Sequence, residues 1–109
     1  MPAEQITLTA TMLPTLPKAK GVYAIFARNK ENGKPCHCKF VGETDNLRGE
    51  TSAHFSKNEP NEGLRVFMQS GKTKLMVYEL LPNTSKAERG KTEKEWVKEM
   101  HPKFNKKES

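Results

Sequence analysis

The sequence predicts an α+β fold in which helices flank a small three-stranded antiparallel sheet. Two apolar runs, 22–27 and 37–42, are rich in strand-forming residues and are separated by an Asn-Gly turn. A third strand is predicted at 74–81, and helical spacings of apolar residues lie before and after it. The predicted order along the chain is strand, strand, helix, helix, strand, helix. This order favours helices packed around one sheet.

The chain has 109 residues, which is enough for one domain with a single modest core. We expect a lead-in segment at 1–20, one domain at 21–105 and a charged tail at 106–109. No apolar run approaches the roughly 20 residues that a membrane helix needs. The first residues also lack the pattern of a secretory signal, so we expect a cytoplasmic protein with no membrane segment.

The net charge indicates the kind of partner that the protein could bind, and the cysteines indicate whether a disulfide or a metal site is expected. Lysine and arginine outnumber aspartate and glutamate by 19 to 13, and this excess of +6 is compatible with a polyanionic partner or with a solvated basic tail. Cys36 and Cys38 are expected to be reduced thiols, because a disulfide at this spacing would be strained. A metal site at Cys36-His37-Cys38 is disfavoured, since its three ligands lack the usual zinc spacing.

The first half of the domain is predicted to be a hairpin. Alternation at 5–9 is typical of an edge strand, but Pro14 and Pro17 interrupt regular structure, so we interpret this part as lead-in. The strands at 22–27 and 37–42 are joined by a turn around Asn32-Gly33. Antiparallel pairing would place Tyr23 beside Gly42.

The second half alternates helices with one strand. Thr44 or Asp45 is expected to cap a helix that Gly49 keeps short, with an inward face made by Leu47, Thr51, His54 and Phe55. A second short helix carries Leu64, Phe67 and Met68 and ends at Gly71. Ser85 and Glu88 have capping-box spacing at the start of the last helix, which His101-Pro102 ends.

Glu93 interrupts the apolar stripe of the last helix. It precedes Trp96, Val97 and Met100 by three, four and seven residues, so it lies on the same face. An unpaired charge on a buried face is costly, and such a carboxylate is paired, protonated or bound to a cation. A salt bridge, or a stripe that emerges into water, competes here with a metal ligand.

The ordered motifs of the chain resemble those of the GIY-YIG nuclease family. Gly21-Val22-Tyr23 and Phe40-Val41-Gly42 correspond to the two halves of the name motif, and the remaining matches are Asp45-Asn46-Leu47, His54, Glu93, Pro102 and Asn105. The resemblance implies metal-assisted phosphodiester hydrolysis, with nucleic acid, expected to be DNA, as substrate. It also implies Tyr23, His54, Glu93 and Asn105 as site residues, with Mg²⁺ or Mn²⁺ bound to Glu93.

Two positions depart from the family pattern. Phe40 replaces the usual tyrosine of the second motif, and Glu50 occupies the position of the helix arginine that steadies the phosphate. Arg48 lies about 200° around the helix from position 50, so it cannot simply take over that role. Lys39, Arg48 and Lys57 remain as candidate nucleic-acid-binding cations.

These departures leave alternatives open for the protein and for its residues. A domain that binds nucleic acid without cleaving it is one alternative, and a protein-interaction domain with Trp96 or Phe55 as an anchor is another. Tyr23 could be an ordinary half-buried strand residue, His54 could pair with Glu50, and Asn105 could merely fix the returning chain. The length leaves no room for a separate target-recognition domain, so we expect any sequence specificity to come from a protein partner or to be absent. The sequence does not indicate the oligomeric state.

Overall fold

The computed structural model describes residues 3–105 and contains a four-stranded antiparallel sheet with the order β1-β4-β2-β3. The strands are β1 (Glu4–Leu8), β2 (Gly21–Arg28), β3 (Pro35–Thr44) and β4 (Lys74–Leu80). The α+β class and the helix-flanked antiparallel sheet are confirmed, and the predicted number of strands is not. The predicted tail at 106–109 lies outside the described residues.

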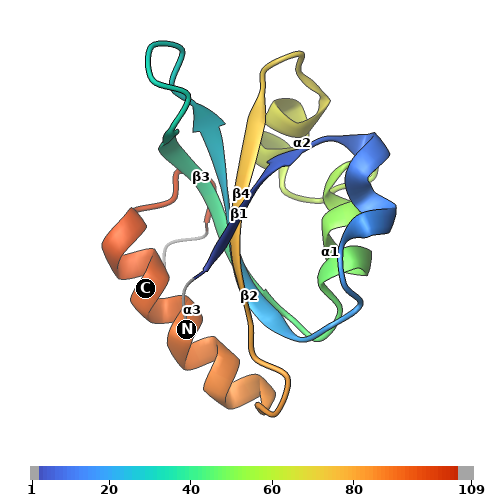
Figure 1. Ribbon diagram of the computed structural model, residues 1–109, viewed down its shortest axis with the longest axis vertical. Coiled ribbons are helices and arrows are strands. Elements are labelled where there is room, and N and C mark those ends of the chain that lie inside the picture. The colour runs from blue at the N-terminus through green and yellow to red at the C-terminus, as the bar shows by residue number, and fades with distance from the viewer. Residues whose placement is uncertain (1–2, 106–109) are drawn as a thin grey trace.

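Helices cover both faces of this sheet (Figure 1). The 3-10 helix η1 (Ala10–Thr15) lies with α1 (Leu47–His54) and α2 (Glu62–Gln69) on one face, and α3 (Lys86–Met100) lies on the other. The larger core fills the α1 and α2 side, where Tyr23, Ile25 and Met76 from the sheet meet Leu47 and Leu64 from the helices. Burial of these side chains is the main term that stabilises the fold.

The fourth strand, β1, is the correction to the three-stranded prediction. Glu4 pairs with Tyr78 and Leu8 with Lys74, so the segment interpreted as lead-in forms one edge of the sheet. Leu8 is buried in the core, which gives this short strand its stability. Pro14 does not interrupt β1 because it lies beyond it, inside η1.

The β2–β3 hairpin is confirmed with its predicted register. Tyr23 pairs with Gly42, and the register shifts nearer the turn, where β3 has two more residues than β2. The extra residues are His37 and Lys39, which lie between the paired positions of β3. A Cβ atom at Gly42 would lie 2.6 Å from the Tyr23 hydroxyl oxygen. Any larger residue at position 42 would therefore force the Tyr23 side chain to move.

The helices match the predictions closely, with small corrections at their ends. Asn46, rather than Thr44 or Asp45, caps α1, because its Oδ1 accepts a hydrogen bond from the Gly49 amide at 3.1 Å. Thr44 instead accepts from the Asn46 amide through its hydroxyl at 3.0 Å. α1 is short, as predicted, and α2 ends at Gln69, before the predicted Gly71.

The last helix begins and ends as predicted. Ser85 and Glu88 form a complete capping box, and His101 ends α3 in a left-handed conformation directly before Pro102. Trp96, Val97 and Met100 pack on the sheet residues opposite the larger core, so the predicted apolar stripe is confirmed. Within the described residues both cysteines are free, and no helix is long and apolar enough to cross a membrane.

Candidate active site

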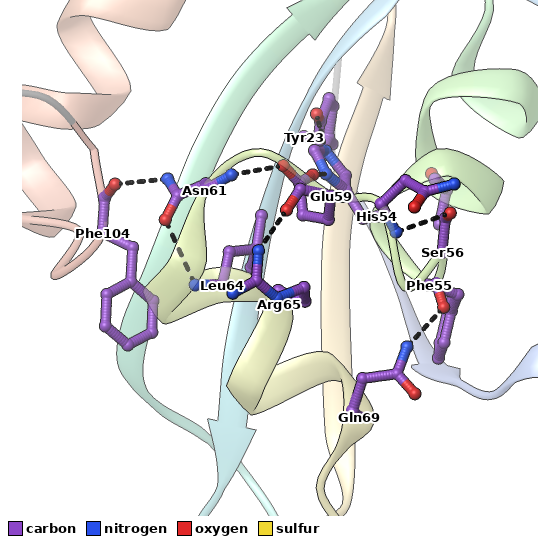
Figure 2. Close-up of polar contacts among 12 residues, drawn as sticks. Tyr23, His54, Phe55, Ser56, Glu59, Asn61, Leu64, Arg65, Gln69 and Phe104 are labelled. Carbon is purple, nitrogen blue, oxygen red and sulfur yellow. Dashed lines mark hydrogen bonds and ion pairs between the residues drawn. The ribbon is translucent and has the colours of Figure 1, made fainter.

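Tyr23 lies at the centre of the site. It belongs to the inner strand β2, its side chain is 1% exposed, and its hydroxyl lies 2.6 Å from His54 Nε2 (Figure 2). The ring of Phe40 packs against both, with centroids 6.1 Å from Tyr23 and 5.1 Å from His54. Tyr23 is therefore more deeply buried than an ordinary half-buried strand residue.

His54 links Tyr23 to a second buried group. It occupies the last turn of α1, and its Nδ1 bonds to the carboxylate of Glu59. An ionised carboxylate only accepts hydrogen bonds, so the proton of the neutral imidazole lies on Nδ1 and Nε2 accepts from Tyr23. This tautomer gives a continuous chain of hydrogen bonds from Tyr23 through His54 to Glu59.

Glu59 is held in place by the loop between α1 and α2 (Figure 2). The Asn61 amide donates to Glu59 Oε2 at 2.8 Å, and Arg65 donates to the Glu59 carbonyl oxygen at 3.0 Å. Asn61 also caps α2 through the Leu64 amide and donates to the Phe104 carbonyl oxygen at 2.7 Å. The loop thus connects the site to α2 and to the C-terminal segment.

Glu59 was missed by sequence reasoning, which assigned no role to any carboxylate between the two short helices. A loop residue has no periodicity that could indicate burial, and here the side chain is 6% exposed. The only available signal was indirect. A histidine on the inner face of a helix needs a polar partner, and Glu59 is the next carboxylate along the chain.

Burial and carboxylates oppose ionisation of Tyr23. Burial is the larger cause that raises the pKa of the Tyr23 hydroxyl well above its usual 10.0, since the phenolate would lose its hydration. Four carboxylates add to the shift by repelling the phenolate, namely Glu50, Glu59, Glu93 and Glu43 in decreasing order. The hydroxyl therefore keeps its proton unless a neighbour accepts it, and His54 is positioned to do so.

Glu93 comes from the opposite face of the sheet. It is partly buried on α3, and its charge is one of the four that raise the pKa of the Tyr23 hydroxyl. In residues 3–105 no three His, Cys, Asp or Glu side chains form a cluster that could hold a metal ion. Mg²⁺ commonly binds through one or two carboxylates together with waters and substrate phosphate, so a carboxylate such as Glu93 has the donor chemistry for such an ion.

None of the three predicted cations contacts the Tyr23–His54 pair. Arg48 donates through Nε to the Leu16 carbonyl oxygen at 2.6 Å, which ties α1 to the segment after η1. Lys39 lies 5.3 Å from the ring centre of Phe67, and Lys57 is exposed. Glu50 stands where the resemblance places an arginine that steadies the phosphate. None of these three cations takes over that role beside Tyr23 and His54.

Arg89 was also missed by sequence reasoning. It is the one buried residue of α3, and it donates through Nε to Glu43 at 3.1 Å and through Nη1 to the Thr84 carbonyl oxygen at 2.8 Å. Lys86 lies 3.6 Å from the same carboxylate. This ion pair partly neutralises Glu43, one of the carboxylates that act on Tyr23.

Asn105 fixes the C-terminal segment to the edge of the sheet. Its side chain both accepts from the Val41 amide and donates to the Val41 carbonyl oxygen, each at 2.8 Å. The amides of Lys103 and Phe104 bond to carbonyl oxygens of β3 as well. Through these contacts Asn105 holds the C-terminal segment against β3 at Val41, the residue before Gly42.

Comparison with known proteins identifies the family of the chain. A family model described as the GIY-YIG catalytic domain matches residues 19–108. A comparison with curated proteins gave no significant match. Because the family model covers most of the chain, from the approach to β2 through the C-terminal segment, the chain belongs to the GIY-YIG family, whose members are nucleases.

Proposed function

We propose that this domain hydrolyses phosphodiester bonds in DNA, as a metal-dependent endonuclease or nickase. The observation that carries the proposal is the buried hydrogen-bond chain from Tyr23 through His54 to Glu59. Buried polar chains of this kind are costly to build unless they are fully satisfied, and no buried side-chain polar atom lacks a partner within the described residues. Membership of a nuclease family supports the same function.

The chain can relay one proton. As the water oxygen bonds to phosphorus, the bond from phosphorus to one ester oxygen breaks, and that leaving oxygen takes a proton from solvent. The attacking water gives a proton to the Tyr23 oxygen, while the Tyr23 proton passes to His54 Nε2. The resulting imidazolium is stabilised by the Glu59 carboxylate on its other nitrogen. The high pKa of Tyr23 fits this role, because the phenolate never has to persist.

Glu93 would hold Mg²⁺ or Mn²⁺ in this proposal. The bound ion would neutralise charge on the phosphate and on the leaving oxygen. The donor chemistry fits, since an oxygen ligand from a carboxylate suits a hard cation. Glu93 would thereby orient the phosphate toward the Tyr23 hydroxyl, and Asn105 would hold β3 in register beneath it.

A second candidate function is binding of nucleic acid without cleavage. Glu50 and Phe40 favour it, because a carboxylate cannot steady the reacting phosphate as an arginine would, and phenylalanine lacks the hydroxyl of the usual tyrosine, so catalysis would be lost while the basic surface remains. The protein-interaction alternative has less support. Phe55 and Trp96 are both partly buried against the core, and Val66, at 63% exposure, is the exposed large apolar side chain of the described residues.

Nicking of supercoiled plasmid in Mg²⁺ or Mn²⁺ separates the two candidates. We expect slow nicking by the wild-type protein, its loss in Glu93→Ala, and faster nicking in Glu50→Arg, which restores a cation. Binding of the plasmid with no nicking by wild type in either metal would reject hydrolysis and leave the binding function. Nicking that persists in Glu93→Ala would reject the assigned metal ligand.

A further inference from the structure

The end of the sheet opposite the Tyr23 site carries five cations, which we call the hairpin-end cluster: Arg28, Lys30, Lys39, Lys72 and Lys103. The first two lie at and beyond the end of β2, and Lys72 lies just before β4. Figure 1 shows the β2–β3 turn and the start of β4 at the same end of the sheet. Lys39 in β3 and Lys103 in the C-terminal segment complete the cluster, since the backbone of that segment bonds to β3 beside it.

Two adjoining hollows open beside these side chains. One of about 560 Å³ is lined by Arg28, Lys30 and Lys72, and one of about 470 Å³ is lined by Lys39 and Lys103. His37 lines both hollows, so together they form one continuous basic surface. Glu31 is the single carboxylate in either lining.

The charges of the cluster are not compensated within the protein. Among residues 3–105 none of the five cations takes part in a salt bridge. Partial burial lowers the pKa of Lys39, and the ammonium groups of Lys103 and Lys72 lower it further, so these three charges repel one another at short range. An anion placed between them would relieve that repulsion.

Aromatic rings hold two of the ammonium groups in position. The Lys39 Nζ lies 5.3 Å from the ring centre of Phe67 and 5.9 Å from that of Phe104, and the Lys103 Nζ lies 5.6 Å from Phe104. Such contacts are favourable for a cation and restrict a long side chain. The cluster is therefore partly preorganised as well as basic.

The two ends of the sheet differ in charge. Four carboxylates raise the pKa of Tyr23, and one of them, Glu43, is paired with Arg89 and Lys86, whereas none of the cations of the hairpin-end cluster is ion-paired within the described residues. Lys39 is three residues from Gly42 along β3, which corresponds to about 10 Å at the usual rise of a strand. A separation of this size is short compared with a duplex of even a few base pairs, so one DNA molecule could contact both ends of the sheet.

We propose that the hairpin-end cluster is a contact for the phosphate backbone of the DNA that is bound at the Tyr23 site. The inference rests on the proposed action on nucleic acid and adds where the substrate is gripped. The ammonium and guanidinium groups would contact the charged phosphates and would not contact the edges of the bases. The contact is therefore expected to be independent of DNA sequence. It would offset the repulsion that the carboxylates near Tyr23 exert on a phosphate.

The test is the salt dependence of binding to a short fluorescein-labelled DNA duplex, measured by fluorescence anisotropy. The cluster variant is Lys39→Gln/Lys72→Gln/Lys103→Gln. The control variant Lys91→Gln/Lys94→Gln/Lys98→Gln removes the same charge from exposed positions of α3. For the cluster variant we expect the slope of log K against log salt to fall by about 2 to 3, and for the control we expect no change of slope.

Each outcome decides something different. If wild type binds and both variants lower the slope equally, or the cluster variant does not lower it, the inference is overturned and the proposed function stands. If wild type shows no binding at low salt, the proposed function itself fails. Should circular dichroism show that the cluster variant is unfolded, Arg28→Gln/Lys30→Gln decides, because it leaves the aromatic contacts intact and should lower the slope by about 1 to 2.

Discussion

His54 gives the site its character at the scale of single residues. Its two ring nitrogens face a phenol on one side and a carboxylate on the other, in a place with little access to water. Tyr23 and His54 could be identified from their motif positions, and the face of α1 that carries His54 followed from its periodicity. Glu59 could not, because a buried loop residue is defined by tertiary contacts alone.

Removal of the Glu59 charge should slow hydrolysis. In Glu59→Gln the side chain keeps its shape but no longer stabilises an imidazolium, so we expect plasmid nicking to fall on the order of 100-fold. Glu95→Gln, which removes the same charge from an exposed position of α3, should nick like wild type. Equal rates for the two variants would rule out a role of Glu59 in proton transfer.

Alkaline titration should find both tyrosines resistant to ionisation. The pKa of Tyr23 is raised mainly by burial, and that of Tyr78 is raised by burial and by its hydrogen bond to Glu4. Because the native state holds these protons more tightly than the unfolded state, the resulting stability is complete below about pH 10 and is lost as pH rises through the native pKa values.

Phenolate absorbance measures this directly, since the chain has only these 2 tyrosines. In Tyr78→Phe we expect no phenolate signal until the protein unfolds, because Tyr23 is the more strongly shifted group. A native Tyr78→Phe protein that titrates near pH 10, the ordinary value, would show that burial and the carboxylates do not hold the proton on Tyr23.

At the scale of elements, the edge of β3 is closed by the C-terminal segment. Asn105 makes two hydrogen bonds to Val41, and each such bond contributes about 0.5–1.5 kcal/mol. We therefore expect Asn105→Ala to lower the free energy of unfolding by about 1–3 kcal/mol in urea titrations. Asn83→Ala, in an exposed turn, serves as the control, and a loss no larger than that of the control would argue against the bracing role.

Elements with local signals were predictable, and those that depend on distant contacts were not. The hairpin followed from its Asn-Gly turn and α3 from its capping box, because residues close in sequence determine both. β1 was missed because its only strand partner is β4, which begins at Lys74. The alternation at 5–9 is typical of an edge strand, but Pro14 and Pro17 follow it, so the local features together favoured an extended lead-in.

At the scale of the whole molecule, the net charge of +6 conceals an uneven distribution. Four carboxylates raise the pKa of Tyr23, and cations gather at the opposite end of the sheet. Composition gives only the sum, whereas the distribution depends on which ends of the strands meet. The sequence could therefore suggest a polyanionic partner without indicating where it binds.

The most direct test of the proton relay compares plasmid nicking by wild type and Tyr23→Phe in Mg²⁺. Phenylalanine keeps the ring that packs against Phe40 and His54 and removes only the hydroxyl. We expect Tyr23→Phe to nick at least about 100-fold more slowly than wild type while its circular dichroism spectrum is unchanged. Equal nicking by both proteins, with Glu93→Ala inactive in the same assay, would contradict the relay.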